Sequence, residues 1–138
     1  MTVPSFRSFF EGYAVASMGG ETQAVANHYA PTFIVSGRDG SAAFQNNEEL
    51  LDWLNSVVER NRDVGMQSLE VASLRDTPVG DHHALVTVQW ATTFEKTGDE
   101  RIRFEISYLL RLTEDGPLIL AYVSHEDEQE LMKGKGLI

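Results

Sequence analysis

The stretch that decides the fold is residues 82–126, HHALVTVQWATTFEKTGDERIRFEISYLLRLTEDGPLILAYVSHE. Side chains of a β-strand point alternately to its two faces, so an apolar residue at every second position predicts a strand with one apolar face. His82–Glu95 and Arg101–Leu112 both follow this pattern. Their apolar faces carry Ala84, Val86, Val88, Trp90, Thr92, Phe94, Ile102, Phe104, Ile106, Tyr108, Leu110 and Leu112.

Two short glycine-containing segments separate three such strands. Lys96–Asp99 precedes the second strand and Glu114–Pro117 follows it, and each contains the glycine that a tight reversal needs. We therefore expect consecutive antiparallel hairpins. The third strand, Leu118–Ser124, is apolar on both faces, which is typical of a central strand.

The residues before this block predict a helical cover. Val3–Met18 places its aromatic residues on one stripe at helical spacing, and Glu21–Tyr29 predicts a shorter helix that ends before Pro31. A small hairpin is expected next, with its strands at Thr32–Ser36 and Ser41–Gln45.

A third helix follows, capped by Asn46 or Asn47, and it ends near Val64. Asn61 falls in its apolar arc, close enough to the end to act as a C-terminal cap. Met66–Leu74 predicts a further strand, followed by a turn. The apolar arc contains Leu50, Leu51, Trp53, Leu54, Val57 and Val58, and the opposite side contains Asp52, Asn55, Ser56, Glu59 and Arg60.

Helices followed mainly by strands indicate the α+β class, and a length of 138 residues indicates one domain over 1–138. The net charge of −10 argues against nucleic acid or an anionic membrane as partner. We expect no membrane span and no export signal. The chain has no Cys, which fits the cytoplasm and excludes disulfides and thiolate chemistry.

No metal or nucleotide cofactor is expected. The four His residues show no ligand spacing with each other or with a carboxylate on one predicted element. The sequence also contains no Gly-rich phosphate loop and no GxSxG elbow.

The segments AVANHYAPTFIVSGRDGSAAFQNNEELLDWL (24–54) and ISYLLRLTEDGPLILAYVSHED (106–127), in this order, resemble the NTF2-like superfamily and its SnoaL-like group. The resemblance implies a cone, in which a strongly bent, mostly antiparallel sheet of about six strands wraps around three helices and leaves a pocket. It also implies a homodimer formed through the outer face of the sheet. Members range from isomerases, cyclases and dehydratases to ligand-binding and protein-association modules, so the fold does not select a function.

These patterns predict a pocket lined mainly by aromatic side chains, which would suit a small apolar molecule. The alternative is that the same side chains fill a solid core. The residues that we expect to bind a ligand are Tyr13, His28, Trp53, Val57, Trp90, Phe104 and Ile106.

Enzymes of this fold typically need an acid or a His in the pocket as general base, together with a donor to the oxyanion. The apolar strand faces carry no such base, and Glu105 falls on the opposite face by parity. His125, just after the last strand, is the remaining candidate base, with Tyr122 or Tyr108 as donor. A strand-end His without a catalytic role is the alternative.

Three hypotheses follow. The first is a cytoplasmic homodimer that binds a small, largely apolar metabolite. The second is an isomerase, cyclase or dehydratase that uses His125 as base. The third is a protein-association module with a filled cone.

Overall fold

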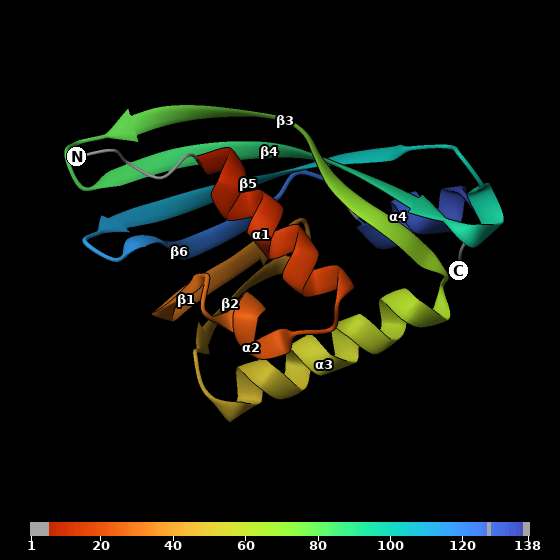
Figure 1. The fold of residues 1–138 in the computed structure, drawn as a ribbon, viewed down its shortest axis with the longest axis horizontal. Helices are drawn as coiled ribbons and strands as arrows, with labels where there is room; N and C mark the ends of the chain where they lie inside the picture. The colour runs from red at the N-terminus through yellow and green to blue at the C-terminus, as the bar shows by residue number, and fades with distance from the viewer. Residues whose placement is uncertain (1–5, 127, 137–138) are drawn as a thin grey trace.

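The computed structural model describes residues 6–126 and 128–136, which form a six-stranded mixed sheet with helices packed against one face (Figure 1). The strands are β1 (Tyr29–Gly37), β2 (Gly40–Gln45), β3 (Met66–Val79), β4 (His83–Phe94), β5 (Ile102–Thr113) and β6 (Gly116–Ser124). The helices are α1 (Phe6–Met18), α2 (Thr22–Ala26), α3 (Glu48–Asp63), the 3-10 turn η1 (Glu95–Thr97) and α4 (Glu128–Gly134). The predicted α+β class is confirmed.

The sheet order is β2-β1-β6-β5-β4-β3, and every neighbouring pair is antiparallel except β1 with β6. The two predicted hairpins, β4 with β5 and β5 with β6, are therefore present. β6 lies between β1 and β5, as its two apolar faces predicted. This arrangement brings the last strand of the chain beside the first.

Alternation along β4 separates a buried inner face from an outer face. Val86, Val88 and Trp90 are at most 1% exposed, whereas Leu85 is 43% exposed. Trp90 pairs with Phe104 of β5, and directly paired residues point to the same face of a sheet, so the even-numbered residues of both strands face the interior. Phe10 of α1 packs on this inner face, with its ring 4.6 Å from that of Tyr108.

The pairing register of the sheet shifts at several points. Shifts occur between Met66 and Ser68 and between Val71 and Ser73 on β3, and on β6 between Ile119 and Ala121, which pair with Leu110 and Leu109 of β5. Irregularities of this kind increase strand twist and let a sheet curl. β3 curves around the helices toward the C-terminal end of α3 (Figure 1), which gives the expected cone.

Two predicted element boundaries were wrong. Tyr29 begins β1 instead of ending a helix, and Pro31 lies inside that strand, where the pairing with β6 is irregular. β3 continues to Val79 through the predicted turn and through Pro78. The physical reason is that β3 is an edge strand, where a proline without an N–H group is tolerated.

The polar ends of α3 follow the usual rules for helices. The Asn47 side chain accepts a hydrogen bond from the Glu49 backbone N–H at 3.0 Å, so Asn47 is the N-cap. Asn46 instead donates to the carbonyl oxygens of Ala26 and Tyr29, at 2.8 and 3.1 Å, and ties the start of β1 to the start of α3. Leu50 and Leu54 are buried against the core.

Candidate functional site

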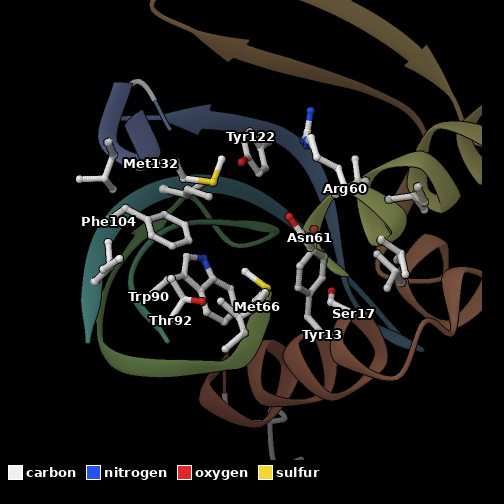
Figure 2. Close-up of a pocket in the computed structure, with 18 of the residues that line it drawn as sticks. Tyr13, Ser17, Arg60, Asn61, Met66, Trp90, Thr92, Phe104, Tyr122 and Met132 are labelled. Carbon is white, nitrogen blue, oxygen red and sulfur yellow. The ribbon is translucent and has the colours of Figure 1, made fainter. Parts of the chain in front are cut away.

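A pocket with a volume of about 200 Å³ lies between α1, α3, α4 and the inner face of the sheet (Figure 2). Its lining is mainly aliphatic and aromatic. From α1, α2 and β1 come Tyr13, Ser17, Val25 and Tyr29, and from α3 come Trp53, Leu54, Val57, Val58, Arg60 and Asn61. The strands β3 to β6 and helix α4 contribute Met66, Leu69, Trp90, Thr92, Phe94, Ile102, Phe104, Ile106, Tyr108, Tyr122, Leu131 and Met132.

Most of the residues predicted to bind a ligand surround this pocket. Those that line it are Tyr13, Trp53, Val57, Trp90, Phe104 and Ile106, together with Tyr108 and Tyr122 from the predicted catalytic set. Val86, Val88 and Leu110, at the other end of the same strands, are fully buried in the core and do not line it. One end of the cone is therefore packed solid and the other end is hollow.

A group of hydrogen-bonded aromatic side chains makes one wall of the pocket rigid. The hydroxyl groups of Tyr13 and Tyr29 lie 2.8 Å apart, and Trp90 Nε1–H donates to the Tyr108 hydroxyl at 3.1 Å. Burial raises the pKa of Tyr29 well above its ordinary value, and the neighbouring phenols of Tyr13 and Tyr108 raise it further. Tyr29 therefore stays neutral and contributes a fixed dipole to this wall.

His28 does not line the pocket. Its Nδ1 lies 2.8 Å from the Ala24 carbonyl oxygen, which can only accept, so Nδ1 carries the proton. The imidazole packs between Phe9 and Tyr13, at ring distances of 4.7 and 5.5 Å. These contacts give His28 a packing role behind Tyr13.

His125 also lies away from the pocket, on the outer face of the sheet. Tyr122 faces Tyr108 on the inside, so the parity of β6 turns Val123, and His125 beyond the strand, to the outside. His125 Nε2 lies 2.6 Å from Ser107 Oγ and its Nδ1 lies 3.4 Å from Glu105 Oε2. The predicted role of His125 as a base inside the cone has no support in this geometry.

The outer-face contacts of His125 form a short polar network. The Ser107 hydroxyl, which contacts the His125 imidazole, also lies 2.8 Å from the Thr87 hydroxyl. On the other side of the network, Arg75 contacts the Glu105 carboxylate at 3.5 Å. A serine, an imidazole and a carboxylate in contact can share a proton. None of these residues lines the pocket on the inner face.

Several lining residues were not predicted. Arg60 was expected on the solvent side of α3 and Asn61 as a cap, yet both line the pocket. The sequence does contain a signal for this position. Residues three and four apart lie on the same side of a helix, and this spacing places Arg60 and Asn61 in one row with Trp53 and Val57. Leu131 and Met132 of α4 close the site, and that helix lies in a segment for which no element was expected.

Within 6–126 and 128–136, His, Asp and Glu side chains form no group of three or more that could hold a metal ion. No helix in the described part of the chain has the length and apolar character needed to cross a membrane.

The comparisons with known proteins agree with the fold. A family model described as "NTF2-like protein (DUF6841)" matches residues 4–127. No curated protein sequence matches the chain.

Solved structures of low sequence identity share the fold. An NTF2-like protein of unknown function from Shewanella oneidensis is 14% identical, with a TM-score of 0.66 over 86% of this chain and 94% of the other. A Nostoc punctiforme domain with a cystatin-like fold is 15% identical, with a TM-score of 0.67 over 94% and 82%. A Catenulispora acidiphila protein with a ketosteroid isomerase-like fold, in complex with trimethylamine, is 17% identical, with a TM-score of 0.59 over 99% and 96%.

Proposed function

We propose that this chain, which belongs to the NTF2-like family DUF6841, binds a small, largely apolar molecule in the pocket between α3 and the inner face of the sheet. The observation that carries the proposal is the hollow end of the cone, where Trp53, Trp90 and Phe104 surround about 200 Å³. Concave, mainly apolar pockets with a few polar groups are typical of small-molecule sites.

The lining favours binding over proton-transfer catalysis. The described residues of the pocket wall include no Asp, Glu or His, and the tyrosines supply donors but not a base at neutral pH. His125, the predicted base, contacts Ser107 and Glu105 on the other face. The isomerase, cyclase or dehydratase hypothesis therefore has no candidate base in this wall.

A ligand screen tests the proposal. We expect one-ring aromatic compounds to raise the Tm by several degrees when present at about 100 times their Kd, because such binding stabilises the folded state by about 2.7 kcal/mol. Larger, steroid-like compounds should have weaker effects, since a cavity of about 150 Å³ is filled by benzene.

A pocket-filling variant gives the matched control. Val57→Trp places an indole in the cavity and should abolish the ligand-dependent rise in Tm, whereas Asn55→Trp places the same side chain on the exposed side of α3 and should keep it. The proposal fails if no compound stabilises the wild-type protein, or if both variants respond alike.

We also propose a cytoplasmic homodimer that forms through the outer face of the sheet. The outer face exposes Ile34, Leu85 and Val123 at 48, 43 and 43%. Its ionic groups carry both signs, with Glu105 beside Arg75, and such a surface can match a second copy of itself across a two-fold axis. The lack of Cys fits a reducing compartment.

A further inference from the structure

The charge of the pocket wall differs from the charge of the whole chain. The chain carries a net charge of −10, yet among the described residues that line the pocket the charged side chain is an arginine, Arg60. Every other described lining residue is apolar or neutral. The wall of the pocket is therefore positive in an acidic protein.

Four other arginines of this chain contact carboxylates, and among the described residues Arg60 has no such partner. Arg7, Arg38, Arg75 and Arg101 contact carboxylates at 2.7 to 3.5 Å. Within the described ranges, no carboxylate lies within ion-pair distance of Arg60. Its five N–H donors are thus available to solvent or to a bound molecule.

Asn61 adds a neutral amide next to this guanidinium. Its side chain is half-buried and lines the pocket. Figure 2 shows Arg60 and Asn61 on the α3 side of the pocket, with Trp90 and Phe104 across from them. One side of the site is therefore polar and the other is aromatic.

This division fits one class of ligand. A guanidinium presents a planar fork that matches the two oxygens of a carboxylate, and an amide N–H can donate to the same group. The aromatic side provides room for a body of limited size, because about 200 Å³ is slightly more than the roughly 150 Å³ that encloses a benzene ring.

We propose that the ligand is a small monocarboxylate with an apolar body about the size of one aromatic ring. Its carboxylate lies against Arg60 and Asn61, and its ring lies against Trp90 and Phe104. This inference rests on the proposed function, since it names the class of molecule that the same pocket binds.

Calorimetric titration with benzoate and benzamide tests the proposal, because the two compounds share size and shape and differ in charge. We expect the wild-type protein to bind benzoate on the order of ten-fold more tightly than benzamide. Arg60 is exposed, so water screens the pair, and added salt should reduce the preference. Arg60→Gln should remove the preference, because it weakens the binding of benzoate far more than the binding of benzamide.

Arg62→Gln is the matched control, because it removes the same charge from the last turn of α3 at a residue that does not line this pocket. It should keep the preference for benzoate. The inference is overturned, while the proposed function stands, if benzamide binds as tightly as benzoate or if the two variants behave alike. The inference is also overturned if neither compound binds while another one-ring aromatic compound raises the Tm, and the proposed function fails as well only if no compound of the ligand screen binds the wild-type protein.

Discussion

The two faces of the β4–β5–β6 sheet differ in what the same strands place on them. The inner face presents Trp90 and Phe104 to a cavity, whereas the outer face presents Ser107, His125 and Glu105 to the surface. Because successive side chains of a strand point to opposite faces, one stretch of sequence supplies the side chains of both faces. A residue's parity on its strand, and not its chemistry alone, therefore decides whether it can reach a ligand in the pocket.

The largest expected difference between the faces is in stability. Trp90→Ala should lower the free energy of unfolding by about 3–5 kcal/mol, because it leaves a large cavity. It also removes the hydrogen bond to the Tyr108 hydroxyl. Gln89→Ala, next in sequence but on the outer face, should change the free energy of unfolding by about 0.5 kcal/mol or less. Urea unfolding measures both, and equal losses would contradict the assignment of the faces.

Association of two copies should depend on the outer face. Val123→Lys places a charge within the proposed contact and should weaken the homodimer on the order of ten-fold or more, since the change occurs twice in a symmetric interface. Sedimentation velocity measures the effect. Val15→Lys, at an α1 position that is 73% exposed, is the control and should leave the dimer intact. A monomeric wild-type protein would rule out this contact.

Ligand binding should depend on the inner face. Phe104→Ala should weaken the binding of a one-ring aromatic ligand by about ten-fold, because it removes an aromatic wall of the pocket. His125→Ala should leave the affinity within about two-fold. Calorimetry compares the two variants. A large loss of ligand affinity in His125→Ala would indicate that this imidazole contributes to the binding site, and it would support the enzyme hypothesis.

The smallest expected effect is in alkaline stability. The pKa of Tyr29 is raised in the folded state, so above a pH of about 10 the unfolded chain loses this proton first. The unfolded state then binds fewer protons than the folded state, and stability falls as pH rises through the folded pKa. The Tm of Tyr29→Phe should therefore fall less steeply above this pH than that of the wild-type protein. Identical slopes would contradict the pKa shift.

The fold was predictable because period-two alternation in β4 and β5 is strong and because glycines mark the reversals between the strands. The resemblance to the NTF2-like superfamily is confirmed by the family match over residues 4–127. The strand at Met66 was predicted, but its continuation to Val79 and the start of β1 at Tyr29 were missed, because pairing with neighbouring strands overrode the local signals of Pro78 and Pro31.

The site was less predictable than the fold. The alternation of apolar residues correctly predicted the inner face of β4 and β5. It does not determine whether the side chains on that face enclose a cavity or fill a solid core. The inner-face residues that line the pocket include Trp90, Phe104, Ile106 and Tyr108. His125 lies past a strand that is apolar on both faces, so parity could not be read from the sequence alone. Arg60 was misplaced because a helix that covers only part of a sheet leaves its last turns at the rim of the pocket.

The most direct test of the pocket uses the two tryptophans of the chain, Trp53 and Trp90, which both line it. In a nitrogen-15 NMR titration with benzoate, and in parallel with benzamide, we predict that both indole N–H signals shift in a saturable way while the backbone amide of His125 stays in place. Indole signals that do not move, or shifts confined to Ser107 and His125 on the outer face, would contradict the claim that the hollow end of the cone is the binding site.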